Sequence, residues 1–237
     1  SSDLRNQITD IKAPAQLEDY DWSPDGKEFV LNVSPSPGRM MPLPNYSGQF
    51  VTAAPFPRDV AGDALAIPQI LLIASDGTEP TPRPVTGLTG ISPGLPEWSD
   101  DSKHLWGITF TRDYKSQQVW IIDRDTATAA TVFKDTDPAW AFDMAAGWSP
   151  DSRHIWLLSE RDGHGHLYTT DINGKNLEQI TRGAWDVMEE SGISREPQWI
   201  GGYLYFSSTE AGTQNRRLYR IPVDKSAGVE SISPAEG

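Results

Sequence analysis

The sequence contains no cysteine in its 237 residues, which excludes disulfides, thiol nucleophiles and thiolate metal sites. It has no apolar run near the roughly 20 residues that a membrane-spanning helix needs. The N-terminal stretch SSDLRNQITD contains neither a methionine nor the apolar core of a signal peptide. Basic residues are scarce, 20 against 33 acidic ones, and the formal charge of −13 repels nucleic acid and anionic membranes. We therefore expect no nucleic-acid partner, no membrane span and no signal peptide in this chain.

Aromatic and turn-forming residues are frequent: 9 tryptophans, 20 glycines and 19 prolines fit a turn-rich all-β chain. Residues 148–187 contain four short β-like runs with turns between them. In the second run, alternation places Ile155 and Leu157 on one face of the strand. Trp156 and Leu158 lie on the other face by the same alternation. Four short strands in about 40 residues are typical of one blade of a β-propeller.

This unit recurs along the chain with a period near fifty residues. The spacing from Trp98 to Trp148 is 50 residues, and that from Trp148 to Trp199 is 51. The related motifs are WSPDGK at 22–27, WSDDSK at 98–103, WSPDSR at 148–153 and a degenerate WIGGYL at 199–204. A fixed period with these features predicts an all-β fold, a β-propeller of four-stranded antiparallel blades.

The repeats predict a single propeller domain or propeller fragment over residues 1–237. Its four visible blades are expected at approximately 20–87, 96–133, 142–183 and 197–234. A propeller protects the edges of its sheets by closing into a ring. Four blades therefore indicate part of a larger seven- or eight-bladed ring, or a chain that forms homo-oligomers through its open blade edges.

The first blade is interrupted by residues 34–66, a stretch rich in proline, glycine and methionine. We expect it to be a long excursion between the second and third strands of that blade. Its repeated prolines remove ladder donors, so a regular strand pair is not expected there. Long loops often carry function or contacts. A functional segment and a plain surface insertion both remain open.

Two motifs that could suggest catalysis or metal binding each lack a group that this chemistry needs. Residues 90–94 (GISPG) match the pattern of a hydrolase nucleophile elbow, but Pro93 has no N–H to contribute to an oxyanion hole. His164 and His166 are two residues apart, but no carboxylates stand at a metal-ligand spacing from them. We therefore predict no catalytic residue, no metal site and no cofactor in this chain.

Carboxylates occur in two informative patterns. Asp25, Asp101 and Asp151 recur at one position of the repeat, and we expect them to cap their turns through backbone hydrogen bonds. Glu189 and Glu190 are adjacent, in a segment that we expect to contain a short helical turn. Such a pair can hold an ammonium group, so these two residues are the candidate substrate-binding groups. A solvated acidic linker is the simpler interpretation of the same pair.

Several segments of the sequence resemble a known protein family. Residues 159–187 (SERDGHGHLYTTDINGKNLEQITRGAWDV) resemble the propeller domain of the dipeptidyl peptidase IV branch of the prolyl oligopeptidase family. In that family this region reads Ser-Glu-x-Asp-Gly-x-x-His-Leu-Tyr, followed by a Gly-Lys turn and Leu-Thr-x-Gly-x-Trp-Glu-Val. The other similar segments, in chain order, are 22–27 (WSPDGK), 55–77 (PFPRDVAGDALAIPQILLIASDG), 111–126 (TRDYKSQQVWIIDRDT) and 205–224 (YFSSTEAGTQNRRLYRIPVD).

The resemblance implies a function for the parent protein. It implies a serine exopeptidase that acts on peptide N-termini, in which an eight-bladed propeller caps an α/β-hydrolase domain. The propeller would restrict access and help position the peptide N-terminus, so its partners would be the peptide and the protein's own C-terminal hydrolase domain. A periplasmic or extracellular location is the matching expectation.

Two departures from the family pattern are visible. We expect the α/β-hydrolase domain to be absent from these 237 residues. The Glu-Glu pair that grips the substrate amine in the family has no counterpart at residues 9–12 (TDIK), and Glu189 and Glu190 lie elsewhere in the family's order. The WSPDG repeats alone are shared with TolB-type propellers. The alternative function is therefore a TolB-like propeller module that binds a protein partner.

Overall fold

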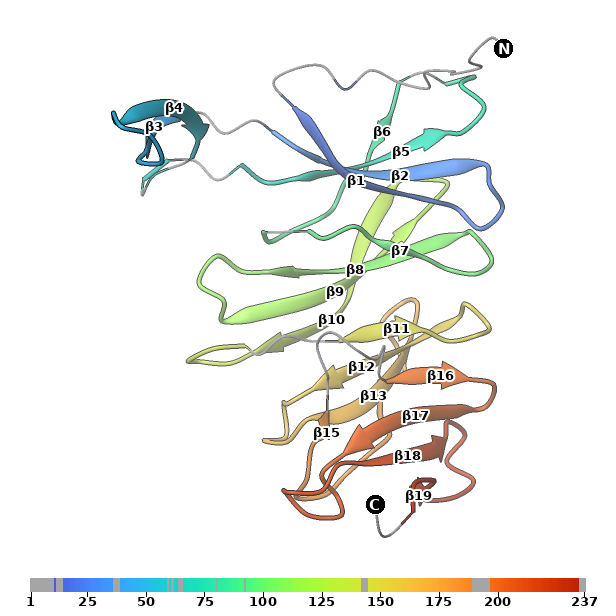
Figure 1. Ribbon diagram of the computed structural model, residues 1–237. Coiled ribbons are helices and arrows are strands. Elements are labelled where there is room, and N and C mark those ends of the chain that lie inside the picture. Colours follow the sequence, from blue (N-terminus) through green and yellow to red (C-terminus); the bar gives the residue numbers. More distant parts are fainter. Residues whose placement is uncertain are drawn as a thin grey trace, which may run out of the picture.

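The computed structural model describes residues 11, 15–35, 39–58, 60, 62–63, 66–79, 81–91, 93–141, 145–188 and 197–234. All strand pairs of the sheets in this described part are antiparallel, and it contains no helix (Figure 1). It accordingly contains no helix long and apolar enough to cross a membrane. The predicted fold class, an all-β propeller-type architecture of antiparallel four-stranded sheets, is confirmed.

Four sheets follow one another along the chain. The first contains β1 (Gln16–Trp22), β2 (Glu28–Ser34), β5 (Gln69–Ala74) and β6 (Arg83–Pro84). The second contains β7 (Glu97–Trp98), β8 (His104–Phe110), β9 (Ser116–Asp123) and β10 (Thr128–Thr136). The third contains β11 (Ala146–Trp148), β12 (His154–Ser159), β13 (His166–Asp171) and β14 (Glu178–Gln179).

The fourth sheet differs in its first strand, which is divided into two pieces. It contains β15 (Val187–Met188), β16 (Gln198–Ile200), β17 (Tyr203–Ser208), β18 (Arg217–Pro222) and β19 (Glu230–Ser231). β15 and β16 both pair with β17, at its end and at its start respectively. Met188 therefore lies in a strand, and the helical turn expected around it is wrong at that residue.

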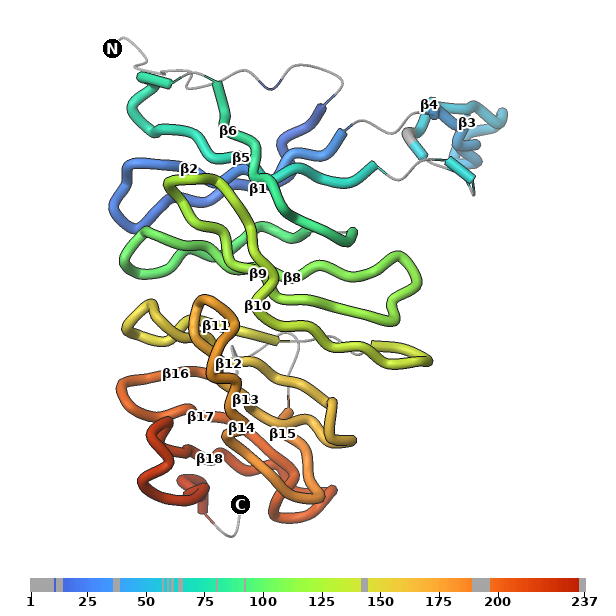
Figure 2. The backbone as a smooth tube through the Cα atoms, turned by 180° about the vertical axis from the view of Figure 1, so that it is seen from behind, coloured from blue at the N-terminus to red at the C-terminus, as the bar shows by residue number. Residues whose placement is uncertain are grey.

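The sheets are stacked in an open row in chain order, with the first and the fourth sheet at opposite ends (Figure 2). The turns between the first and second strands of the sheets all lie on one side, which we call the motif face because it carries the WSPD-type turns (Figure 1). The turns between the second and third strands lie on the other side, which we call the hairpin face. A closed ring is not seen, and membership of a larger ring stays a prediction.

Apolar cores lie between neighbouring sheets, because inner strands such as β2, β9, β12 and β13 bury both of their faces. In β12, Ile155 and Leu157 pack toward the second sheet with Val119. Trp156 and Leu158 pack toward the fourth sheet. The predicted alternation in this strand is therefore confirmed. Such two-sided burial is what binds consecutive sheets of a propeller to one another.

The repeated aspartates cap their turns as predicted. Asp25 accepts hydrogen bonds from the Ser23 hydroxyl at 2.7 Å and from the Lys27 N–H at 3.1 Å. Asp101 and Asp151 make the same pair of contacts in their own turns. The turns are also linked to one another: the Asp25 N–H donates to the Ser102 hydroxyl of the next sheet at 3.0 Å. The motif thus shapes each turn and joins neighbouring turns on the motif face.

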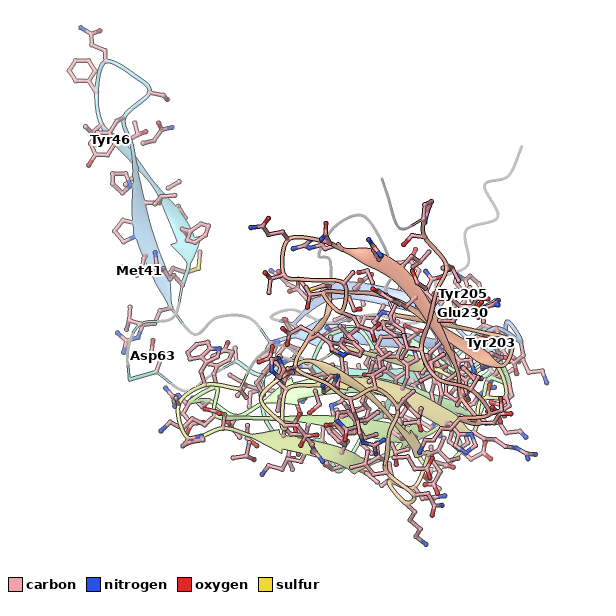
Figure 3. All side chains as sticks on the ribbon, turned by 90° about the horizontal axis from the view of Figure 1, so that it is seen from below. Met41, Tyr46, Asp63, Tyr203, Tyr205 and Glu230 are labelled. Atoms are coloured by element: carbon pink, nitrogen blue, oxygen red, sulfur yellow. The ribbon has the colours of Figure 1, made fainter. Side chains whose placement is uncertain are left out.

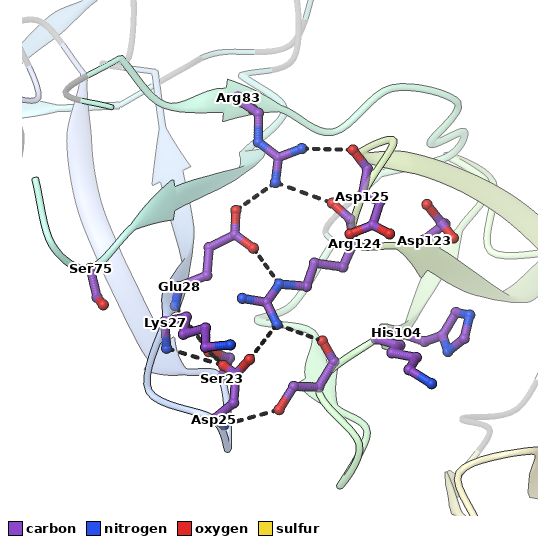
Figure 4. A network of polar contacts seen from close by, with 12 residues as sticks. Ser23, Asp25, Lys27, Glu28, Ser75, Arg83, His104, Asp123, Arg124 and Asp125 are labelled. Atoms are coloured by element: carbon purple, nitrogen blue, oxygen red, sulfur yellow. Dashed lines mark hydrogen bonds and ion pairs between the residues drawn. The ribbon is translucent and has the colours of Figure 1, made fainter. Parts of the chain in front are cut away.

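An ion-pair network adds a polar link between the first two sheets (Figure 4). The Arg124 guanidinium lies 2.7 Å from the Glu28 carboxylate and 2.8 Å from that of Asp25. Arg83 lies 2.5 Å from the other oxygen of Glu28. Glu28 is buried, so its charge is compensated by both guanidinium groups.

The insertion in the first blade corrects one expectation. It lies between β2 and β5, the second and third strands, as predicted, but it contains the paired strands β3 (Met40–Asn45) and β4 (Thr52–Pro57). Register explains how the prolines are accommodated. The Arg58 N–H donates to the Arg39 carbonyl at 3.1 Å. In an antiparallel ladder every second residue pair is hydrogen-bonded, so from this pair the next hydrogen-bonded pair is Met41–Phe56. All four strand prolines lie in the pairs between these, where the N–H group points away from the partner strand and makes no hydrogen bond to it. The prolines in question are Pro42, Pro44, Pro55 and Pro57.

Candidate functional site

A cavity of about 750 Å³ opens on the hairpin face, where the ends of the second, third and fourth sheets meet. Its walls come from segments that are distant in sequence: the end of β10 and the loop after it, the β12–β13 turn, and the start of β15. The side chains that shape it most are Asp135, Asp137, Trp140, Glu160, Arg161 and Asp186. Four of these six are carboxylates, so the cavity is predominantly acidic.

Arg161 forms one rigid wall of the cavity. Its guanidinium lies 2.6 Å from the Asp135 carboxylate, and it also donates to the Lys134 carbonyl at 3.0 Å. The same guanidinium lies over the ring of Phe133, 4.3 Å from its centroid. The Ser159 hydroxyl donates to the second oxygen of Asp135. Arg161 and Asp135 therefore neutralise one another and leave the remaining carboxylates to set the charge of the cavity.

Trp140 stands at the lip of the cavity in a loop held by hydrogen bonds. Asp137 accepts from the N–H groups of Ala139 and Trp140, at 2.7 Å and 2.9 Å, and these bonds lower the pKa of Asp137. The Trp140 ring stacks on Tyr114 with a centroid distance of 5.3 Å and an interplanar angle of 4°. Trp140 is nevertheless 55% exposed. Its exposed ring offers a flat apolar surface beside the carboxylates.

Glu160 and Asp186 form an acidic part of the cavity lining, opposite in charge to Arg161. Asp186 accepts from the Gly165 N–H at 2.9 Å and lies 3.2 Å from Nδ1 of His164. No residue in the described part of the chain donates a hydrogen bond to the Glu160 carboxylate. Partial desolvation and the neighbouring Asp186 carboxylate raise the pKa of Glu160. Glu160 is thus a carboxylate placed to be stabilised by an incoming cation.

Glu189 and Glu190, the predicted substrate-binding pair, lie outside the described residues. They directly follow Met188, which lines the cavity. Their role stays a prediction.

The two histidines are both described. His166 is buried and uses its two ring nitrogens with the Thr181 hydroxyl at 3.1 Å and the Gly183 carbonyl at 3.0 Å. His164 pairs with Asp186 instead. Among the described residues no group of three metal-ligating side chains is found.

Sequence reasoning missed Glu160, Arg161 and Asp186 as neighbours. All three lie in the segment 159–187 that carries the family resemblance, but Asp186 is separated from Arg161 by 25 positions along the chain. No local pattern marks them, because the cavity forms only when turns of different sheets come together.

The later part of the chain matches a known family. Residues 96–237, more than half of the chain, match the family described as "Dipeptidyl peptidase IV (DPP IV) N-terminal region". This region contains the second, third and fourth sheets and every residue that lines the cavity.

Similar proteins are found among curated sequences. An uncharacterized protein of Agrobacterium fabrum is 25% identical over 94% of this chain and 60% of its own length. Dipeptidyl-peptidase 5 of Porphyromonas gingivalis is 24% identical over 76% of this chain and 23% of its own length. The chain therefore spans less than two thirds of each of these relatives.

Solved structures show the same fold. Dipeptidyl peptidase 4 of Porphyromonas gingivalis matches with a TM-score of 0.69 and 16% identity, over 90% of this chain and 30% of that one. A putative dipeptidyl aminopeptidase IV of Bacteroides ovatus matches with a TM-score of 0.67 and 17% identity, over 91% and 32%.

Proposed function

The chain belongs to the family of dipeptidyl peptidase IV N-terminal regions, and from this premise we propose that it is the non-catalytic propeller part of a serine exopeptidase. In this role it restricts access to a hydrolase domain elsewhere in the longer protein and positions the N-terminus of the peptide. The bond-breaking groups belong to that hydrolase domain, so the isolated chain hydrolyses no peptide. The protein acts in the periplasm or outside the cell.

The observation that carries this proposal is the Glu160 carboxylate in the acidic cavity. A peptide N-terminus is an ammonium group, which a carboxylate binds through short, charge-assisted hydrogen bonds. Asp186 adds negative charge nearby, and Arg161 is already neutralised by Asp135. The exposed ring of Trp140 supports an apolar side chain or a cation beside the same carboxylates.

The cavity also suits a filtering role. It is bounded by turns from three sheets on the hairpin face, so a peptide end enters it more readily than a folded chain. With a volume of about 750 Å³, it is large enough for a few residues. We infer that the hairpin face is the side that meets the hydrolase domain.

The test is steady-state kinetics of the full-length protein with chromogenic peptides that have a free N-terminus. Glu160→Gln keeps the shape of the side chain and removes its charge. Losing one charge-assisted hydrogen bond, about 1.5–3 kcal/mol, should raise KM roughly tenfold or more with little change in kcat. The matched control is Glu79→Gln, an exposed glutamate between β5 and β6 that does not line the cavity. A KM for Glu160→Gln equal to that of the control would sink this role for the cavity.

The pH dependence gives a second readout of the same proposal. Glu160 binds the ammonium group only when ionised, and its pKa lies above the ordinary value of about 4.3. As the pH falls through this raised pKa, KM of the unmodified protein should therefore rise. In Glu160→Gln that part of the pH dependence should be missing. Parallel pH profiles for the two proteins would contradict the assignment of Glu160.

A further inference from the structure

His164 lies next to the acidic part of the cavity, in the turn between β12 and β13. Its Nδ1 atom is 3.2 Å from Oδ1 of Asp186, a residue of the cavity lining. The two side chains are 38% and 46% exposed, so water reaches both of them. This histidine has no role in the proposed function. It is a titratable group in direct contact with a carboxylate that shapes the cavity.

Hydrogen bonds fix Asp186 through one of its two carboxylate oxygens. In addition to the contact with His164, Oδ1 accepts from the Gly165 N–H at 2.9 Å. The backbone N–H of Asp186 donates to the Thr209 hydroxyl at 3.0 Å, which ties this residue to the fourth sheet. Within the described part of the chain, no residue donates a hydrogen bond to Oδ2. One oxygen of a firmly held carboxylate is therefore left for a ligand in the cavity.

His164 shares its turn with three charged residues. Arg161 is paired with Asp135, so its charge is already compensated. Asp162 accepts a hydrogen bond of 2.7 Å from a tyrosine hydroxyl. Glu160, the third, receives no hydrogen bond from the described residues. Glu160 is thus the charged group of this turn that stays open to the cavity.

The neighbouring elements bring no second accessible histidine. The ring of His166 has its centroid 6.3 Å from that of His164, but it is buried and both of its nitrogens have partners. The fourth sheet approaches through the uncharged Thr209, and the acidic residue beside it, Glu210, is exposed. Figure 3 shows the β3–β4 hairpin standing clear of the four sheets, and none of its residues lines the cavity. Among the described residues around this part of the cavity, His164 is therefore the accessible side chain that can gain a positive charge.

A charge on His164 acts on both open carboxylates of the cavity. Partial desolvation and the Asp186 carboxylate raise the pKa of Glu160, whereas a positive charge on His164 lowers it. Histidine is the side chain that ordinarily changes its charge between about pH 5 and 8. With a neutral imidazole, Glu160 and Asp186 present two negative charges to the cavity. With a protonated imidazole, one of these charges is compensated.

We propose that His164 makes peptide binding in the cavity depend on pH: its neutral ring leaves Asp186 to attract the ammonium group of the peptide, and its protonated ring compensates Asp186 and weakens that attraction. This inference rests on the proposed function, because it needs a cavity that binds a peptide N-terminus. His164 acts through Asp186 and is a positioning residue. The pair is partly exposed, so the effect on the dissociation constant is modest, roughly two- to fivefold.

The test is isothermal titration calorimetry of the full-length protein with phenylalanyl-alanine amide at about pH 7 and about pH 5.5. This ligand has a free ammonium group and no carboxylate. Its α-amino group, with an ordinary pKa of about 7.7–8.0, is mostly charged at both pH values. The quantity compared between variants is the dissociation constant in acid divided by that at neutral pH. A substitution that only disturbed the structure would weaken binding at both pH values and leave this ratio unchanged.

His164→Gln keeps a hydrogen-bond donor beside Asp186 but cannot gain a charge. It should lower the ratio roughly two- to fivefold relative to the unmodified protein. In Glu160→Gln, the part of the ratio that depends on His164 should remain. The matched control is His154→Gln, because His154 lies 3.5 Å from Asp151 next to a turn of the motif face and does not line the cavity. This control should show the ratio of the unmodified protein.

Proton release gives an independent readout. By linkage, a cation that binds near a histidine favours its neutral form, so the unmodified protein should release protons when the peptide amide binds near pH 6. Titrations in buffers with different ionisation enthalpies measure this release. His164→Gln should release fewer protons than His154→Gln.

Two results would overturn the proposal, and they are distinguishable. If the ratio and the proton release of His164→Gln equal those of the unmodified protein, His164 has no part in binding, while the proposed function stands because the peptide still binds. If the peptide amide binds at neither pH, or no more tightly than its N-acetylated form, the cavity does not recognise an ammonium group. The proposed function then fails together with this inference.

Discussion

At the scale of single residues, Arg124 carries the polar link between the first two sheets. It reaches Asp25 and Glu28 of the first sheet and also donates to the Ser102 carbonyl at 3.0 Å. Its side chain is only 17% exposed, so water replaces these contacts poorly. The Trp98 ring lies 5.6 Å below the guanidinium and adds a cation–π contact.

Replacing this guanidinium should destabilise the protein. We predict that Arg124→Gln lowers the free energy of unfolding by about 2 kcal/mol, as expected for lost hydrogen bonds to charged groups. Glu28 keeps its contact with Arg83, which limits the loss. Thermal or urea unfolding measures the effect. Arg153→Gln, at an exposed position of the third sheet's motif, is the control and should change stability little.

The same residue should make stability depend on pH. The hydrogen bond from Arg124 holds the pKa of Asp25 well below its ordinary value. A carboxyl group with a depressed folded-state pKa stabilises the fold above its unfolded pKa, about 3.9, and loses this effect as pH falls through the folded value. The stability difference between the unmodified protein and Arg124→Gln should therefore be largest near neutral pH and shrink in acid. A difference that grows in acid would contradict this account.

Some residue roles were readable from the sequence and others were not. The capping role of Asp25 follows from its recurrence in a turn motif, since the motif is local. The exposure of Trp140 was not predictable, because it depends on the Asp137 bonds and the Tyr114 stack that hold its loop open. Glu160 carries no local signal at all.

At the scale of elements, the β3–β4 hairpin shows why proline content alone is a misleading guide to strand formation. Proline is excluded only from the half of strand positions whose N–H donates a hydrogen bond to the neighbouring strand. In β3 and β4 every proline lies at a position whose N–H would point away from the partner strand, so the two strands still pair. Counting prolines predicted an irregular loop, whereas their spacing permits a hairpin.

This register predicts opposite outcomes for two neighbouring substitutions. Ala54 pairs with Leu43 at a ladder position, so Ala54→Pro removes an inward N–H and should open the hairpin. Ala53 pairs with Pro44 and turns its N–H outward, so Ala53→Pro should be tolerated. Limited proteolysis within residues 39–58 should accelerate several-fold for Ala54→Pro alone, with global unfolding unchanged in both variants. Equal cleavage rates would show that the assigned register is wrong.

At the scale of the whole molecule, periodicity was the strongest information in the sequence. The recurring tryptophan motif predicted the antiparallel sheets, and the alternation in residues 154–159 predicted which side chains face each neighbour. The cavity could not be predicted in this way. It forms where the end of β10 and its following loop, the β12–β13 turn and the start of β15 approach one another, which depends on packing between sheets and not on any one repeat.

The central claim of the proposed function is that the chain is the peptide-binding, non-catalytic part of an exopeptidase that recognises a free N-terminus. Its most direct test is an assay of the full-length protein and of this chain alone. The substrates are a chromogenic peptide and its N-acetylated counterpart. The account predicts that the full-length protein releases dipeptides from the free peptide, cleaves the acetylated one at least a hundredfold more slowly, and that the chain alone cleaves neither. Equal cleavage of both peptides by the full-length protein would contradict the claim.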